Sequence, residues 1–230
     1  ERPLRPRRHA PGKPSLPEER PRVPRDVYAD LRSAARPGEV DDVVGAYATA
    51  GEALAAGDVG RAIELLEWAK SAAARSVAVR EALGVARYHA GDFAGAHSEL
   101  LTYRRLSGRQ DQNHLLADCA RAAARPDKVV EYVDAMASAG VPAERLAEAL
   151  IVLAGDRADR GDLDGAMRAL ERADLQPAEV RPHHVRLWYV AADLAARHGD
   201  EDAAVDYLQA IDAVEPGYLD VEDRLRALGG

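Results

Sequence analysis

Histidines and aspartates at three places in the chain are the side chains most able to bind a metal ion. His183 and His184 are adjacent, so on a helix they would point apart, and we expect them on the surface of a connector. His114 and Asp118 are four residues apart on one helical face, but two ligands make a weak site. The run 162–165 resembles the start of a calcium loop but lacks its alternating acids and downstream glutamate, which favours a capped turn. The sequence predicts no metal site and no cofactor.

Cys119 is the only thiol in the chain, which excludes an intramolecular disulfide and a zinc site built from several cysteines. It lies among alanines in a predicted helix, so we expect it to be buried and unreactive. The sequence lacks the phosphate-loop, dinucleotide-binding and HExxH zinc motifs, and we predict that the protein is not an enzyme. No run of about 18 apolar residues would span a membrane. A cytoplasmic protein is the simplest interpretation, although the absence of an initial methionine leaves a removed signal peptide open.

A recurring Gly-Asp phrase divides the chain into units of similar length. Its copies begin 34, 34, 36 and 38 residues apart, and the third copy is degenerate. Glycine ends a helix because it adopts positive φ at little cost, and the following aspartate can cap the next helix. An alanine or valine five positions after the first residue lets two helices approach closely. The copies occupy 57–62, 91–96, 125–130, 161–166 and 199–204.

Apolar residues recur at helical spacing on both sides of each phrase, which predicts a helix, a turn and a second helix per unit. Five such hairpins are expected over residues 41–217 or so. A short helix is expected before them at Asp26–Ala35, since Arg36-Pro37-Gly38 stops it. A closing helix is predicted over 218–228, and it would cover the apolar face of the last hairpin. Its inward residues are Val221, Leu225 and Leu228.

These residues resemble the tetratricopeptide repeat family. Its pattern has a small residue seven places before the turn glycine, as at Ala50 and Gly84, and often a closing proline, as at Pro216. The tryptophan expected near each repeat's start is absent, and the third copy departs from the pattern. The resemblance implies a right-handed, all-α solenoid of about five hairpins, in a single domain over residues 26–230. The chain also resembles uncharacterised actinobacterial repeat proteins with a basic Pro/Arg-rich tail.

Residues 1–25 differ in composition from the rest of the chain. They carry eight basic and three acidic side chains and seven of the 13 prolines, so their net charge is +5 against −13 for the rest. Because prolines disfavour helix and apolar residues are few, we expect an extended, mobile tail. It could be an electrostatic arm for nucleic acid or the ribosome, or a solvated leader that lies loosely on its own acidic body. The arm residues would include Arg2, Arg5, Arg7 and Arg8.

In proteins of the family that the chain resembles, the first helix of each hairpin lines a concave groove that binds partners. Three of the corresponding side chains here are tyrosines, which could anchor a partner or could pack between repeats. The lysines and asparagines that clamp acidic chaperone tails are absent, and the acidic body favours a basic or apolar partner segment. The predicted partner-binding residues are Tyr47, Glu81, Tyr88, Gln112, Arg186, Tyr189, Asp193 and Arg197.

The leading hypothesis for function is a non-catalytic scaffold that binds a protein segment in this groove. The alternative is a factor tethered to nucleic acid or the ribosome by its basic tail. The sequence does not separate the first hypothesis from an accessory subunit of an enzyme. It also leaves open self-association through the end of the repeat array.

Overall fold

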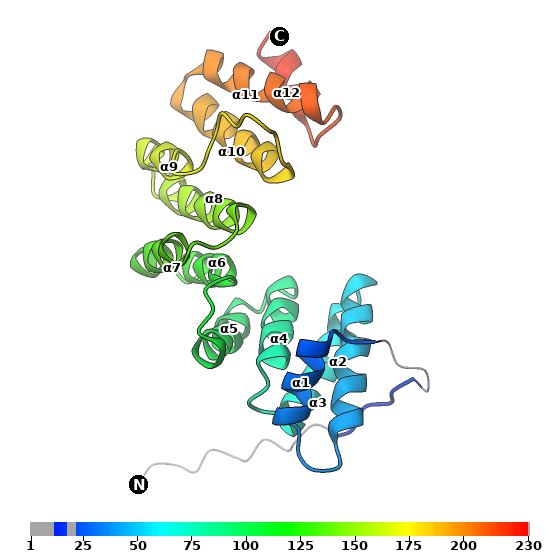
Figure 1. Cartoon of the computed structure of the whole chain (residues 1–230). Helices are drawn as coiled ribbons and strands as arrows, with labels where there is room; N and C mark the ends of the chain where they lie inside the picture. Colours follow the sequence, from blue (N-terminus) through cyan, green and yellow to red (C-terminus); the bar gives the residue numbers. More distant parts are fainter. Residues whose placement is uncertain (1–11, 18–21, 230) are drawn as a thin grey trace. The chain divides into compact units, whose positions relative to one another are not determined.

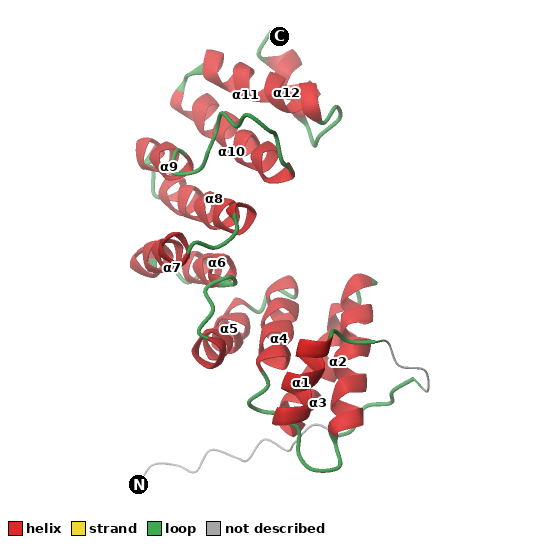
Figure 2. Ribbon diagram, in the orientation of Figure 1, coloured by secondary structure: helices red, strands yellow, loops and turns green. Residues whose placement is uncertain are grey.

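A computed structural model describes residues 12–17 and 22–229 of the chain. Every regular element within those ranges is an α-helix, and none is a strand (Figures 1 and 2). The chain divides into two compact units, residues 1–109 and 110–230, which are described separately. The predicted all-α class is therefore confirmed. Continuity of the repeat array between the two units stays a prediction.

The first unit contains a single helix followed by two antiparallel hairpins. Helices α2 and α3 form the first hairpin, α4 and α5 the second, and α4 packs against both α2 and α3. Helix α1 lies against α2 and α4, which are the first helices of the two hairpins. The helices are α1 Arg25–Ala34, α2 Val40–Ala55, α3 Val59–Ala72, α4 Val77–His89 and α5 Phe93–Ser107.

The second unit contains three hairpins and a short closing helix. Helix α8 packs against both α6 and α7, α10 packs against both α8 and α9, and α12 packs against α11. All five predicted hairpins are therefore present in the two units. The helices are α6 Asn113–Ala122, α7 Pro126–Ala139, α8 Ala143–Asp159, α9 Leu163–Leu170, α10 Pro182–His198, α11 Glu201–Val214 and α12 Val221–Ala227.

Aspartates cap the second helix at four of the five elbows, as the recurring phrase predicts. Each carboxylate accepts a hydrogen bond from the backbone amide three residues later, at 2.8 to 3.0 Å, which satisfies one free donor of the helix N-terminus. The degenerate third elbow differs. Ala124 takes the positive φ of 52° and no side chain caps α7, which instead begins at Pro126. The capping residues are Asp58, Asp92, Asp162 and Asp200.

Small residues at the predicted close approaches are buried in both units. Alanines 62, 96, 166 and 204 are all 0% exposed. Gly84 on α4 faces Leu100 on α5, and a Cβ atom there would lie 2.6 Å from Leu100 Cγ. A larger side chain would push the two helices of this hairpin apart.

The closing helix is shorter than the prediction of 218–228. It begins at Val221, because Gly217 and Leu219 adopt positive φ values of 80° and 46° and keep the preceding segment irregular. Val221 is fully buried, and Leu225 and Leu228 pack against the same apolar cluster, as predicted. The first helix, predicted over Asp26–Ala35, begins and ends one residue earlier.

Residues 12–17 of the predicted tail are attached to the first unit. Leu16 packs against its apolar core and Pro14 is buried. Lys13 Nζ lies 2.6 Å from Asp42 Oδ2, and Arg61 donates to the carbonyl of Ser15 at 2.6 Å. A few apolar residues cannot form a core alone, but they add to a core that α2 and α3 already supply. This contact agrees with the interpretation of a segment lying on its own body. The predicted arm residues Arg2, Arg5, Arg7 and Arg8 lie outside the described residues.

Candidate partner-binding faces

The face formed by α2 and α4 in the first unit is covered by α1 (Figure 1). Helix α1 presents Val27, Leu31 and Ala34 at helical spacing toward the apolar core, and Leu31 is 0% exposed. Tyr47, one of the predicted partner-binding residues, packs against the same core as α1. An amphipathic helix laid on a helical groove is a common mode of recognition, and here the helix belongs to the chain itself.

Asp30 fixes α1 across the N-terminus of α4. Its carboxylate accepts hydrogen bonds from the Ser76 hydroxyl at 2.5 Å and from the amides of Val77 and Ala78 at 3.1 Å each. The Ser76 hydroxyl oxygen in turn accepts from the Val79 amide at 3.1 Å. Three of the free amides of α4 are thus satisfied by one carboxylate and one hydroxyl. The sequence pattern identified α1 but gave no sign of this contact.

The surroundings of Tyr47 are acidic. Burial raises the pKa of its hydroxyl, and the nearby carboxylates of Glu81, Asp30 and Asp26 raise it further. Two of these carboxylates come from α1, so the predicted groove residues Tyr47 and Glu81 share their environment with the covering helix. The hydroxyl of Tyr47 therefore stays protonated at neutral pH.

Tyr88 lies at the elbow between α4 and α5. Its ring makes edge-to-face contacts with His89, at 5.9 Å between centroids, and with Phe93, at 5.6 Å. Phe93 remains 37% exposed. Tyr88 therefore contributes to a small aromatic cluster within its own hairpin.

In the second unit, ion pairs join the first helices of neighbouring hairpins. Arg186 on α10 lies 2.7 Å from Glu148 on α8, and Arg121 on α6 lies 2.7 Å from Asp159 on α8. Glu148 and Asp159 are eleven residues apart, or three helical turns, so they mark one face of α8. Ile151, half-buried, lies between them on this face. We call this surface, formed by α6, α8 and α10, the second-unit face.

Gly155 lets an arginine cross α8 on this face. A Cβ atom at Gly155 would lie 3.0 Å from Cζ and Nη1 of Arg121. Further along, Arg197 on α10 donates to the carbonyl of Ala158 at 3.1 Å and lies 3.5 Å from Asp193. The structure thus brings the predicted residues Arg186 and Arg197 to the junction between α8 and α10, while Asp193 pairs with Arg197 within α10.

Comparison with solved structures identifies the fold. The protein resembles YrrB, described as a TPR protein with an unusual peptide-binding site, at a TM-score of 0.54 and 14% identity over 87% of this chain and 99% of that one. It resembles the TPR-like repeats of a putative kinesin light chain of Podosopora anserina at 0.60 and 19% identity, over 82% and 95% of the two chains. It has the tetratricopeptide repeat fold. PilF of Pseudomonas aeruginosa matches at 0.57 and 17% identity, over 86% of both chains. The sequence matches no protein-family profile and no curated protein.

Among the tetratricopeptide-type hairpins of the second unit, a buried histidine bridges α6 and α8. His114 Nδ1 donates to the carbonyl of Asp111 at 3.1 Å, and Nε2 lies 3.5 Å from Arg145 Nη1. Burial, followed by the charge of Arg145, lowers the pKa of His114 to about 4. Its ring is therefore neutral at physiological pH, with Nε2 as the acceptor.

Sequence reasoning missed two charged residues of this face, Arg145 and Glu148. Burial raises the pKa of Glu148, and the charges of Arg186, Arg145 and His183 act in the opposite direction. Both residues lie in the first two turns of α8, where a charged pair three residues apart is an ordinary surface feature. Only the neighbouring helices, which bring Arg186 and His114 to them, set this pair apart.

Tyr189 supports the closing segment of the tetratricopeptide-type array. Its hydroxyl donates to Asp220 at 2.9 Å, its ring lies edge-on to Tyr218 at 5.8 Å, and the Arg224 guanidinium lies 5.3 Å from the ring centroid. Gln112, also predicted to bind a partner, is only 8% exposed, and Cys119 is 3% exposed. The expectation that Cys119 is buried is confirmed. Tyr47, Tyr88 and Tyr189 thus each contact other residues of the chain, although the contacts differ.

Within residues 12–17 and 22–229, no group of three or more histidine, cysteine, aspartate or glutamate side chains could hold a metal ion. No helix there is both long and apolar enough to cross a bilayer.

Proposed function

We propose that this protein is a non-catalytic scaffold that binds a protein segment on its second-unit face. The observation that supports this most is the contrast between the two units. Helix α1 covers the corresponding face of the first unit, whereas the one described helix of the second unit that contacts both α6 and α8 is α7, which belongs to the same hairpin as α6. Ile151 there is a half-buried apolar side chain between the charged side chains of Glu148 and Asp159 on α8. Apolar anchors with a polar rim are the usual anatomy of a recognition surface.

The charge of the second unit favours a basic partner segment with apolar anchors. This unit contains 24 acidic and 13 basic side chains, a net charge of −11, whereas the first unit carries a net charge of +3. A field of this sign attracts cationic segments and repels acidic ones. The covering helix α1 offers a template for the partner's form, since it is an amphipathic helix seated on two first helices.

The similarity of this fold to that of YrrB supports a binding function but does not identify the partner. YrrB is described as having a peptide-binding site, and that statement applies to YrrB alone. Binding of nucleic acid through Arg2, Arg5, Arg7 and Arg8 stays a prediction, and so does a cytoplasmic location.

Affinity capture from the native cell with matched variants tests the proposed function. Ile151→Glu replaces the apolar anchor of the second-unit face by a charge and is expected to abolish capture of the partner. Val214→Glu, at an exposed position on α11, adds the same charge and is expected to retain it. Circular dichroism checks that both variants are folded. Capture of the same proteins by Ile151→Glu and the wild type would contradict the proposal.

A further inference from the structure

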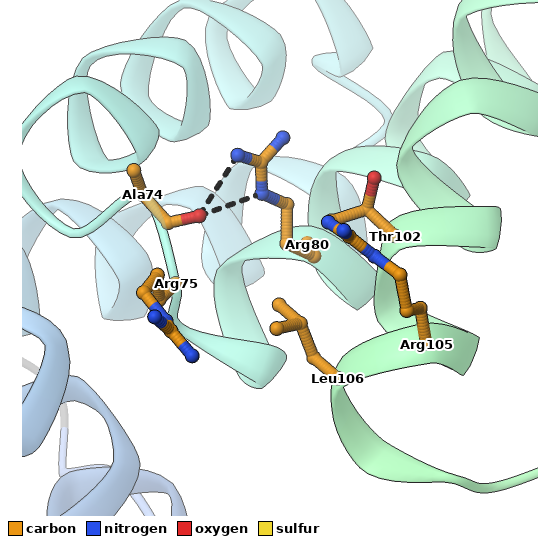
Figure 3. A pocket seen from close by; sticks show the side chains of 6 residues that line it. All are labelled: Ala74, Arg75, Arg80, Thr102, Arg105 and Leu106. Carbon is orange, nitrogen blue, oxygen red and sulfur yellow. Dashed lines mark hydrogen bonds between the residues drawn. The ribbon is translucent and has the colours of Figure 1, made fainter.

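A pocket in the first unit is lined by three arginines from different elements. Arg75 comes from the connector between α3 and α4, Arg80 from the first turn of α4, and Arg105 from the C-terminal part of α5 (Figure 3). Ala74, Thr102 and Leu106 complete the lining, and the cavity volume is about 510 Å³. This volume is within the range of sites that bind small molecules or single side chains of a partner.

Arg80 forms a fixed wall of this pocket. Its Nε and Nη2 atoms donate to the carbonyl of Ala74 at 3.0 and 2.8 Å, as Figure 3 shows. Its Nη1 atom lies 2.5 Å from Glu99, a carboxylate that is 5% exposed and also pairs with Lys70 at 3.0 Å. The charge of Arg80 is therefore compensated inside the hairpin, and its position is set by three contacts to two groups, the Ala74 carbonyl and the Glu99 carboxylate.

Arg75 and Arg105 carry the uncompensated charge of the pocket. Neither side chain makes a hydrogen bond or an ion pair with any residue that the structure describes, and no acidic side chain lines the pocket. The hydroxyl of Thr102 donates to the carbonyl of Ser98 within α5 at 3.0 Å, so it offers no free hydrogen-bond donor to the pocket. Two guanidinium groups at one pocket repel each other unless an anion lies between them.

We propose that this pocket binds a phosphate monoester. Such a group carries nearly two negative charges at neutral pH and so matches the two uncompensated arginines, whereas a carboxylate would balance one. The guanidinium fork donates two parallel hydrogen bonds to phosphate oxygens. Leu106 and Ala74 provide an apolar wall for the group that bears the phosphate. This site lies in the first unit and does not depend on partner binding by the second-unit face.

Isothermal titration calorimetry of the full chain tests the proposal with four probes. They are inorganic phosphate, an alanine pentapeptide with a central phosphoserine, and the same peptide with serine or with glutamate at the centre. The account predicts binding of the phosphoserine peptide, weaker binding of inorganic phosphate and no binding of the serine peptide. If inorganic phosphate binds as tightly as the peptide, the source is a free phosphorylated compound and the site stands. Binding of the glutamate peptide as tight as that of phosphoserine would overturn the assignment.

Charge-matched variants separate the pocket from the general charge of the protein. Arg75→Gln and Arg105→Gln are each expected to weaken phosphoserine-peptide binding by about tenfold or more, as for loss of a charge-assisted hydrogen bond. Arg75→Lys keeps the charge and is expected to retain part of the affinity. Arg125→Gln removes the same charge in the second unit, at an exposed position, and is expected to change nothing. Equal binding by Arg105→Gln and the wild type, or no binding of any phosphate probe, would overturn the proposal.

Discussion

The carboxylate of Asp30 on α1 and the hydroxyl of Ser76, forty-six residues later, are 2.5 Å apart. This contact, with the two amides that the same carboxylate accepts from, seats α1 on the N-terminus of α4. It explains why the face of the first unit, which the resemblance to the tetratricopeptide repeat family implies as a partner-binding face, instead receives a helix of the same chain.

Loss of the Asp30 carboxylate is expected to destabilise the first unit. Asp30→Ala removes the acceptor of three hydrogen bonds at a helix N-terminus and should lower the free energy of unfolding by about 1–3 kcal/mol. Urea unfolding measures this change in the free energy of unfolding through the fluorescence of Trp68, once Trp188→Phe has removed the only other tryptophan. Asp26→Ala, one turn earlier on the same helix and exposed, should change stability by less than about 0.5 kcal/mol. Equal effects of the two variants would refute the capping role.

Two glycines on first helices are expected to respond to alanine with opposite signs. Gly84→Ala brings a Cβ atom within 2.6 Å of the buried Leu100 side chain, so overpacking should destabilise the first unit by about 1–3 kcal/mol. Gly51→Ala on α2 meets no atom within 4 Å, and the gain in helix propensity should stabilise it by about 0.5–1 kcal/mol. The Trp68 unfolding assay measures both. A stabilising Gly84→Ala would show that the hairpin is less tightly packed than described.

The recurring phrase predicts the elements of this fold because its physics is local. A glycine with positive φ and a capping aspartate determine four of the five elbows within six residues, so Gly57 and Asp58 could be assigned their roles without any tertiary information. The third elbow departs from the pattern, because Ala124 adopts the positive φ in place of a glycine and α7 begins at Pro126 without a capping aspartate. Local signals also located α12, although Leu219 shifted its start.

The candidate site could be predicted only in part, because it depends on contacts between distant residues. Resemblance placed Arg186, Asp193 and Arg197 on first helices, and the structure joins each to a neighbouring group. No sequence signal indicated that α1 would cover Tyr47, since an amphipathic pattern predicts a buried face but not the surface against which that face packs. The sequence likewise treats Arg75 and Arg105 as ordinary surface charges, because nothing local shows that they share a pocket.

The neutral state of His114 is expected to make the second unit acid-sensitive. The pKa is about 4 in the folded chain against 6.5 for the free side chain, so the unfolded chain binds the proton more tightly. Stability is therefore complete above pH 6.5 and declines as the pH falls toward 4, by at most about 1.4 kcal/mol per pH unit. Urea unfolding between pH 7 and 4.5, followed by Trp188 in a Trp68→Phe background, measures the slope.

Replacement of His114 isolates its share of this pH dependence. His114→Gln cannot take up the proton, so the decline below pH 6.5 should become shallower, while burial lowers the pKa of His184 too and leaves a residual slope. His89→Gln, at an exposed position in the first unit, should leave the slope unchanged. An unaltered slope in His114→Gln would mean that the histidine is not held neutral.

Site-specific photo-crosslinking in the native cell tests the binding role of the second-unit face most directly. A benzophenone amino acid is placed at Ile151, between Glu148 and Asp159 on α8, and separately at the exposed Val214 on α11. The account predicts discrete protein adducts from position 151 and none from position 214. Adducts from position 214 alone, or no adduct from position 151 in a folded chain, would contradict it.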